Sequence, residues 1–322
     1  MKNGLSVNRL AWKLLEKLCA NPDFYRVKVE KTSFGATVVD AGIEAKGGFE
    51  AGKIITEICM GGCGKARITS RKYGEWTFPT IFVYTDHPIT ATLGSQFAGW
   101  QIKEGDYFAI GSGPARALAL KPKEIYEKIG YRDSFEKAIV VLETEKPPPD
   151  NILERFSKEC KVTPENLAVI LTPTTSLAGA TQVSGRIVET GIHKLNKLGL
   201  DPNVIVNAWG HAPIPAVHPK FAKAMARTND AILYGGTAYY TVEYDDEERL
   251  KEIVEKAPSQ ASEAYGKPFL EIFKEANYDF YKIDPNLFAP AIIIINNTKT
   301  GKIFKSGKVD SEILMESMNI NR

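Results

Sequence analysis

The chain has 322 residues, 43% of them hydrophobic, which is enough to bury one large or two medium-sized cores, and this length favours two lobes. Its 41 lysines and arginines nearly balance its 39 aspartates and glutamates, so the formal net charge is only +2. A charge this close to neutral argues against nucleic-acid binding through a basic surface.

Long apolar segments are missing from the sequence. Its purely apolar stretches are short, such as Ala291–Ile295, and fall far below the roughly 18 residues that a membrane helix needs. Residues 1–18 alternate charged and apolar side chains at helical spacing and lack the continuous apolar core of a secretory signal. We therefore expect a cytoplasmic protein without membrane association.

The four cysteines, at positions 19, 59, 63 and 160, do not form a framework. Only Cys59 and Cys63 are close, and neither a second cysteine pair nor a histidine lies nearby at the spacing of metal ligands. A disulfide scaffold is implausible at this chain length. Buried free thiols are the expectation.

Strands and helices alternate through the first half of the chain. Residues Thr80–Thr85 read as a buried strand, followed by a helix that Asp86 caps and that has Pro88 in its first turn. A second strand is predicted over Tyr107–Ile110, and a helix over Ala115–Leu120 follows it. Glycine and proline punctuate these short elements, which indicates a mixed α/β fold.

A run of three prolines, Pro147–Pro149, marks the predicted boundary between lobes, because proline can neither continue a helix nor donate to a sheet. We expect an N-terminal α/β lobe over residues 1–146 and a C-terminal α/β lobe over residues 150–322, with the C-terminal segment packing back on the first lobe. The predicted fold is therefore α/β, with two mixed lobes and an active-site cleft between them.

The longest helical pattern lies in the second half. A strand over Leu167–Leu171 precedes it, and the helix is predicted over Ser176–Leu198. Lys194 and Lys197 lie in its last turn and Gly199 just beyond, which signals the helix end.

Two pairs of short segments resemble each other across the chain. Residues 94–99 (GSQFAG) resemble 180–185 (ATQVSG), and residues 58–62 (ICMGG) resemble 232–236 (ILYGG). They predict lobes related as pseudo-repeats with rearranged order, although short matches that contain glycine also arise by chance.

The strongest candidate for chemistry is the pair Arg186 and Glu189. A spacing of three places both side chains on one helix face within reach of each other, which also describes an ordinary surface ion pair. The surrounding segment is rich in small residues, including Gly185 and Gly191, which lower helix propensity and would let another backbone or a flat ligand approach. Gln182 precedes Arg186 by one turn and is a weaker candidate for a contact to ligand or water.

The loop Gly111–Arg116 joins a predicted strand to a predicted helix and suits anion binding by backbone N–H groups. Ser112 and Arg116 are its candidate binding side chains. The loop lacks the third glycine of a dinucleotide fingerprint, and a tight structural turn explains it equally well.

The sequence predicts no metal site. No two of its four histidines have a His-x-x-His or His-x-x-x-His spacing. A serine nucleophile elbow, Gly-x-Ser-x-Gly, is also missing.

An aromatic cluster near the C-terminus comprises Tyr278, Phe280, Tyr281 and Phe288. Most such residues belong to a core. Phe288 differs because it lies between prolines just before a strand, where its ring could stack on a flat ligand.

Several long segments together carry a family resemblance. The chain resembles the methenyltetrahydromethanopterin cyclohydrolase family of archaeal and methylotroph one-carbon metabolism, to which methanogenesis belongs. The resemblance covers nearly the whole chain, but departs from the family pattern at residues 208–211, where smaller residues and a loop are expected. Its clearest segments are GGFEAG (47–52), TDHP (85–88), GDYFAIGSGPARALALKPKE (105–124), QVSGRIVETGI (182–192), RTNDAILYGG (227–236), PSQASEAYGKPF (258–269) and YDFYKIDPNLFAPA (278–291).

The resemblance implies a reaction and a site. It implies reversible hydrolysis of the methenyl bridge of methenyltetrahydromethanopterin to the formyl form, by a homotrimer that needs no redox cofactor. The catalytic pair of the family falls on Arg186 and Glu189, and its pterin-stacking phenylalanine falls on Phe288. Two other readings stay open: a nucleotide- or phosphate-binding enzyme that uses Gly111–Arg116, and a pterin carrier without catalytic activity.

Overall fold

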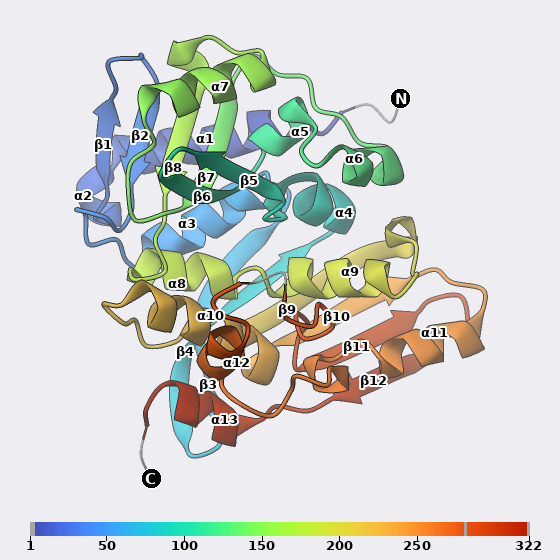
Figure 1. The fold of residues 1–322 in the computed structure, drawn as a ribbon. Coiled ribbons are helices and arrows are strands. Elements are labelled where there is room, and N and C mark those ends of the chain that lie inside the picture. The colour runs from blue at the N-terminus through green and yellow to red at the C-terminus, as the bar shows by residue number, and fades with distance from the viewer. Residues whose placement is uncertain (1–3, 280–281, 321–322) are drawn as a thin grey trace. The chain divides into compact units, whose positions relative to one another are not determined.

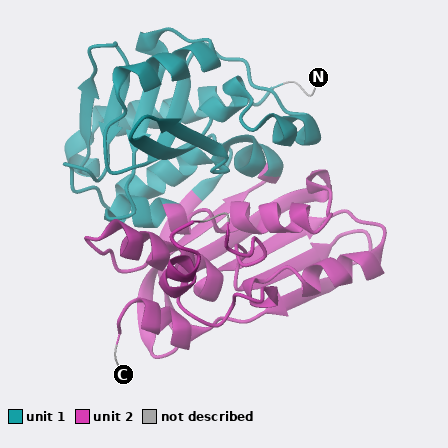
Figure 2. Cartoon of the chain, in the orientation of Figure 1, with its two compact units in different colours: residues 1–65, 89–182 teal, residues 66–88, 183–322 magenta. Residues whose placement is uncertain are grey.

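The computed structural model describes residues 4–279 and 282–320, which divide into two compact units (Figures 1 and 2). Unit 1 comprises residues 1–65 and 89–182, and unit 2 comprises residues 66–88 and 183–322. Each unit is built on one six-stranded mixed sheet, so the predicted α/β class is confirmed. The prolines Pro147–Pro149 lie inside unit 1, and the chain passes between the units elsewhere, at residues 65/66, 88/89 and 182/183.

The sheet of unit 1 mixes parallel and antiparallel neighbours. The strands β2, β8 and β7 run parallel, β1 and β6 pair antiparallel with them, and β5 pairs antiparallel with β6. In spatial order the strands are β1 (Lys28–Lys31), β2 (Thr37–Asp40), β8 (Leu167–Leu171), β7 (Ala138–Glu143), β6 (Tyr107–Ser112) and β5 (Trp100–Glu104).

Helices cover both faces of the sheet of unit 1, and Figure 1 shows α7 on one side and α1 with α3 on the other. The central strands are therefore continuous apolar runs, as strands buried on two faces require. The helices of this unit are α1 (Val7–Ala20), α2 (Pro22–Tyr25), α3 (Phe49–Cys59), α4 (Pro88–Ala91), the π-helix η1 (Thr92–Gln96), α5 (Ala115–Ala119), α6 (Lys123–Ile129), α7 (Asp150–Cys160), the 3₁₀ turn η2 (Pro164–Asn166) and α8 (Leu177–Ser184).

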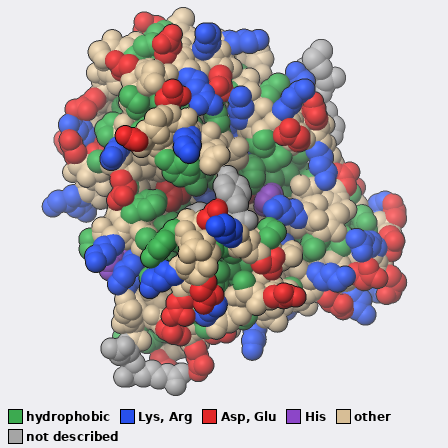
Figure 3. Space-filling view, in the orientation of Figure 1, with side chains coloured by type: hydrophobic (Ala, Val, Ile, Leu, Met, Phe, Trp, Pro, Cys, Tyr) green, Lys and Arg blue, Asp and Glu red, His purple; other side chains and the backbone are tan. Residues whose placement is uncertain are grey.

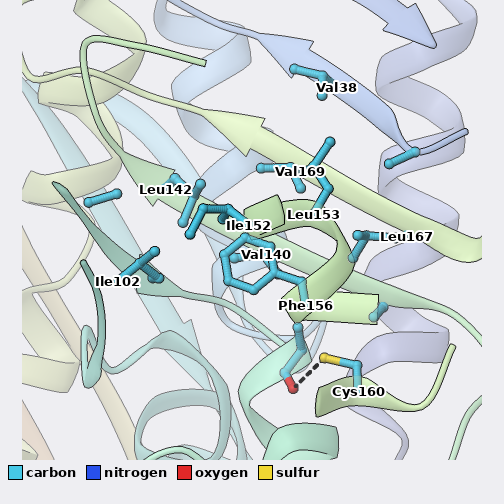
Figure 4. Packing of buried hydrophobic residues seen from close by; sticks show 14 of the residues in the cluster. Val38, Ile102, Val140, Leu142, Ile152, Leu153, Phe156, Cys160, Leu167 and Val169 are labelled. Carbon is cyan, nitrogen blue, oxygen red and sulfur yellow. Dashed lines mark hydrogen bonds between the residues drawn. The ribbon is translucent and has the colours of Figure 1, made fainter. Parts of the chain in front are cut away.

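Alternate residues of one strand serve two cores. Val140 of β7 packs with Phe156 of α7 on one face, while its neighbours Ile139 and Val141 pack with α1 and α3 on the other. Figure 4 shows the first of these cores, in which the Phe156 ring lies among aliphatic side chains from four strands and its own helix. Cys160, the last residue of α7, belongs to the same core, and its thiol donates to the Ala115 carbonyl oxygen at 3.6 Å.

The sheet of unit 2 contains strands that are far apart in the sequence. Strand β4 comes from the short insert 66–88 and pairs antiparallel with β9, so that Thr80 lies opposite Pro213. In spatial order the strands are β12 (Ile303–Gly307), β11 (Ile292–Asn297), β10 (Thr237–Val242), β9 (Ile205–Pro213), β4 (Trp76–Thr85) and β3 (Lys65–Tyr73).

Helices α9 and α11 lie on one face of this sheet (Figure 1). The C-terminal helix α13 packs on α10 within the same unit. The predicted lobe boundaries stay a prediction. The helices of unit 2 are α9 (Ile187–Lys197), η3 (Pro202–Val204), α10 (Phe221–Gly235), α11 (Glu247–Glu255), η4 (Ser259–Ala261), α12 (Phe269–Glu275) and α13 (Ser311–Ser317).

The strands read from apolar runs are present, and β8 has the predicted bounds. The long helix predicted over Ser176–Leu198 is wrong, because it is interrupted at Gly185 and Arg186 and forms α8 and α9. The carboxylate of Asp86, the predicted cap of α4, accepts from the Asn207 side chain at 2.7 Å.

The similar segments occupy similar places. Residues 94–99 and 180–185 each cover the end of a helix, η1 and α8 respectively, and residues 58–62 and 232–236 each cover the end of α3 or α10. The pseudo-repeat stays a prediction.

Positive and negative side chains are interspersed on the face drawn in Figure 3. Within the described residues, none of the helices combines the length and apolar character needed to cross a lipid bilayer.

Candidate active site

The interruption between α8 and α9 places the two strongest candidates at the start of a helix. Arg186 is the N-cap residue of α9, and Glu189 lies in its first turn. The Arg186 carbonyl oxygen accepts from the Thr190 backbone N–H at 2.8 Å and from the Thr190 hydroxyl at 3.0 Å, which holds this first turn. Side chains three positions apart here lie on the same side of the helix. The sequence spacing therefore keeps its meaning although the helix is shorter than predicted.

Glu189 is buried and only 6% exposed, whereas Arg186 is half-buried. The N-terminus of a helix carries partial positive charge, which stabilises a carboxylate in the first turn. The charge of Glu189 also acts on Tyr240, whose phenol donates to the Val188 carbonyl oxygen at 2.9 Å. Burial first, and then the charge of Glu189, hold the pKa of Tyr240 well above its usual value.

Close packing fixes the position of α9 over its sheet. A side chain at Gly191 would place its Cβ 2.0 Å from the Tyr240 hydroxyl, and one at Gly210 would meet Ile187 and Val188 at 3.2 and 3.3 Å. Gly210 belongs to the segment 208–211, which forms part of strand β9 and not the loop that the resemblance led us to expect. Gly191 is thus explained by helix-to-strand packing.

The loop that carries Phe288 lies against α9. The Lys194 ammonium group donates to the Asn286 carbonyl and side-chain oxygens at 3.0 and 2.9 Å. On the C-terminal side of Phe288 in the sequence, the ring of Pro290 lies beside α9, because a Cβ at Gly191 would be 3.2 Å from it. Phe288 is therefore held between two contacts to the helix that carries Glu189.

The Phe288 ring is partly buried and meets Phe269 edge-on, with ring centroids 5.8 Å apart. Tyr278, from the same predicted aromatic cluster, is 58% exposed and packs edge-on against Phe273 instead. Phe280 and Tyr281 lie outside the described residues.

Gln182 is 1% exposed and belongs to the last turn of α8. Because α8 ends at Ser184, Gln182 does not share a continuous helix with Arg186, as the sequence analysis had assumed. The small residues of α8 also have a packing role: a Cβ at Gly179 would lie 2.0 Å from the Pro173 carbonyl oxygen.

The polar groups of the loop Gly111–Arg116 form hydrogen bonds within the protein. The Gly113 N–H donates to the Ser95 carbonyl oxygen at 3.0 Å, and the Ser112 hydroxyl donates to the Val141 carbonyl oxygen at 3.4 Å. Arg116 is fully buried, and its guanidinium group donates to the carbonyl oxygens of Leu93, Ser95 and Lys121. These contacts make the loop a tight structural turn, and the nucleotide-binding hypothesis draws no support from it.

A hollow of about 550 Å³ opens in unit 1, and none of the predicted site residues lines it. Several polar groups that line it are hydrogen-bonded within the protein. Asp40 accepts four backbone N–H bonds, from residues 42–45, and Lys28 pairs with Glu30 and Glu44. A cluster of three or more His, Cys, Asp or Glu able to hold a metal ion does not occur among the described residues.

Sequence reasoning missed Lys194 as a site residue. It was read only as a basic residue that signals the end of a helix, whereas its side chain is 1% exposed. Its position at i+7 from the buried Ile187 places it on the apolar stripe of α9, and this spacing was the available signal.

Two six-stranded mixed sheets, with a buried carboxylate and a half-buried guanidinium at the start of one helix, define this chain as an α/β protein with a candidate acid–base site. The family model described as "Cyclohydrolase (MCH)" matches residues 6–318. The chain belongs to this cyclohydrolase family.

Curated relatives cover almost the whole chain. The chain is 44% identical over 319 residues to the methenyltetrahydromethanopterin cyclohydrolase of Methanothermobacter marburgensis, covering 98% of this chain and 100% of the relative. It is 45% identical over 318 residues to the enzyme of the same name from Methanocaldococcus jannaschii, with 98% of each chain covered. For the Methanosarcina barkeri enzyme of that name the identity is 44% over 317 residues, covering 98% and 99%.

Proposed function

We propose that this enzyme hydrolyses the methenyl bridge of methenyltetrahydromethanopterin reversibly to the formyl form. The observation that carries this proposal is the full-length similarity, at 42–45% identity, to relatives that bear the name of this activity. The buried Glu189 at the start of α9, with the Phe288 loop packed against the same helix, supplies a site suited to the reaction.

The substrate needs an activated water more than an activated carbon. The methenyl carbon bridges two nitrogens as a cationic amidinium and is already electrophilic. Glu189 acts as the general base that takes a proton from water while the oxygen bonds to this carbon. One carbon–nitrogen bond of the tetrahedral adduct then breaks as its hydroxyl becomes the formyl C=O. Glu189 returns its proton to the departing nitrogen, and the hydroxyl proton is released to solvent. The site therefore requires neither a redox cofactor nor a metal ion.

Arg186 orients the Glu189 carboxylate and keeps it ionised, because a neighbouring positive charge favours the charged form of a buried acid. Phe288 stacks on the flat pterin ring, and Gln182 binds the ligand or the water. Ser112 and Arg116 are excluded from the proposed pterin contacts, since their polar groups bind carbonyl oxygens of the protein.

A homotrimer is also proposed. One face of the unit 2 sheet presents partly exposed aromatic rings. The Trp209 ring stacks with those of Phe82 and Tyr239, with ring centroids 5.3 and 5.4 Å apart, and Tyr84 is 37% exposed. An apolar face of this kind is typical of contacts between protein subunits. Size-exclusion chromatography with light scattering gives the mass directly, and a monomeric mass contradicts the proposal. The cytoplasmic location stays a prediction.

The decisive experiment follows the methenyl absorbance after mixing the purified protein with methenyltetrahydromethanopterin. Catalysis predicts decay of this absorbance at a rate proportional to enzyme concentration. A stable bound spectrum without decay identifies a carrier and contradicts the proposal. The methenyl folate analogue in a parallel reaction measures discrimination between the two carriers.

Thermal shift with ATP and NAD tests the nucleotide-binding alternative, which predicts stabilisation by one of them.

A further inference from the structure

The Lys194 side chain is buried and forms two hydrogen bonds. It is 1% exposed, and its ammonium group donates to both oxygens of Asn286, which is itself an exposed residue. The two bonds connect α9 to a loop 92 residues further along the chain. These two hydrogen bonds hold the exposed residue Asn286 against the helix.

Stability alone does not explain a lysine here. Burial lowers the pKa of Lys194 to about 8, while the negative charge of Asp284 opposes this shift and Lys197 adds to it. Burying a charge costs free energy, and an apolar side chain of similar length would fill the same space without that cost. A lysine at this position therefore costs stability relative to an apolar side chain.

The loop that Lys194 binds is ordered by its own contacts as well. Asp284 accepts from the Asn286 backbone N–H at 2.9 Å through one carboxylate oxygen and from the Ser262 hydroxyl at 2.5 Å through the other. The Asp284 carbonyl oxygen accepts from the Leu287 N–H at 3.0 Å. These bonds make residues 284–287 a firm turn, so that a contact at Asn286 also positions the ring two residues later.

We propose that Lys194 is a positioning residue, which holds the Phe288 ring at a fixed place relative to Glu189 on the same helix. The packing of Pro290 beside Gly191 provides the second point of contact, and Phe288 lies between the two. This inference rests on the proposed function, in which Phe288 stacks on the pterin. Lys194 itself touches no reacting atom in this arrangement.

The test compares Lys194→Met with Lys197→Met, a matched control on an exposed position of the same helix. Lys194→Met is expected to raise the KM for the methenyl pterin about tenfold, to leave kcat within about twofold and not to lower the melting temperature. Lys197→Met is expected to match the wild type. An unchanged KM in Lys194→Met, or a fall in kcat and melting temperature without a change in KM, overturns the proposal.

A double-mutant cycle shows whether Lys194 acts through the ring. Phe288→Ala removes the ring, so adding Lys194→Met to it is expected to change KM by less than about twofold. Independent, multiplying effects of the two substitutions contradict the proposal. Asn286→Ala tests the same contact from the exposed loop and is expected to raise KM in the same direction by a smaller factor.

Hydrogen exchange separates this proposal from the proposed function. Faster exchange of the amides of residues 284–290 is expected in Lys194→Met but not in Lys197→Met. A wild-type protein without turnover refutes the proposed function, and the exchange rates then still decide whether Lys194 orders the loop. Normal turnover with unchanged exchange in Lys194→Met refutes the positioning role alone.

Discussion

Helices cover both faces of the unit 1 sheet, whereas the unit 2 sheet has α9 and α11 on one face and partly exposed aromatic side chains on the other. The difference extends to buried charges. In the described part of unit 1 the buried charged residues are Asp40 and Arg116, and both form hydrogen bonds to backbone groups. Unit 2 buries the ionisable side chains of Glu189, Lys194, His211, Arg227 and Asp230.

The contrast separates stability from chemistry. An apolar core packed on two faces maximises buried area and tolerates few polar groups. Ionisable groups inside a fold cost stability and are common where proton transfer or binding takes place. We therefore expect substitutions in the core of unit 1 to act on unfolding, and substitutions on α9 of unit 2 to act on turnover.

The largest expected effect is on turnover and comes from a substitution on α9. Its absence would contradict the comparison between the two units. Glu189→Gln removes the proposed base with little change in shape, so kcat is expected to fall about 10²–10⁴-fold while the melting temperature stays near that of the wild type. Glu124→Gln, on an exposed position of α6 in unit 1, is the control and is expected to keep full activity. Wild-type kcat in Glu189→Gln would remove Glu189 from the mechanism.

The second prediction concerns the core of unit 1. Phe156→Ala empties a fully buried site beside Trp100, whose ring centroid lies 5.1 Å away, and is expected to lower the free energy of unfolding by about 3–5 kcal/mol. Denaturant unfolding measures the loss. The fraction that remains folded is expected to keep the wild-type kcat, and a large fall in kcat per folded molecule would show that unit 1 does more than stabilise.

A third prediction uses the pH dependence of stability. Burial and then the charge of Arg71 lower the pKa of His211 to about 4. The unfolded chain binds this proton near pH 6.5 and the folded chain does not, so stability is expected to decline as pH falls from about 6.5 to 4. His211→Gln is expected to flatten this decline by about 2 kcal/mol. An identical pH profile in the variant would show that other groups control acid unfolding.

The smallest expected effect concerns Asp230, whose carboxylate accepts from the Phe269 N–H at 2.8 Å. Burial raises the pKa of Asp230 to about 7. Because the folded state holds this proton more tightly, stability from this group is present below about pH 4 and is lost as pH rises to 7. Asp230→Asn is expected to stabilise the protein at pH 8 by about 1 kcal/mol. Destabilisation at pH 8 would show that the charged carboxylate is needed to join α10 to α12.

The elements that could be predicted were those with a complete local signal. The apolar run of β8 and the spacing of Arg186 and Glu189 need no distant partner to be read. The break between α8 and α9 was missed, because an apolar pattern continued across Gly185 and Arg186. Arg116 was read as an anion-binding side chain, and only the carbonyl oxygens packed around it show that its guanidinium group is already bound.

The sequence by itself determined the α/β class, several central strands, the family resemblance and the candidate pair Arg186 and Glu189, because periodicity, spacing and long matching segments are local properties of the chain. The tertiary structure alone decided that β4 belongs to the sheet of unit 2, that Lys194 is buried and that the Phe288 loop lies against α9. These features depend on hydrogen bonds and packing between segments far apart in sequence, which no local pattern encodes.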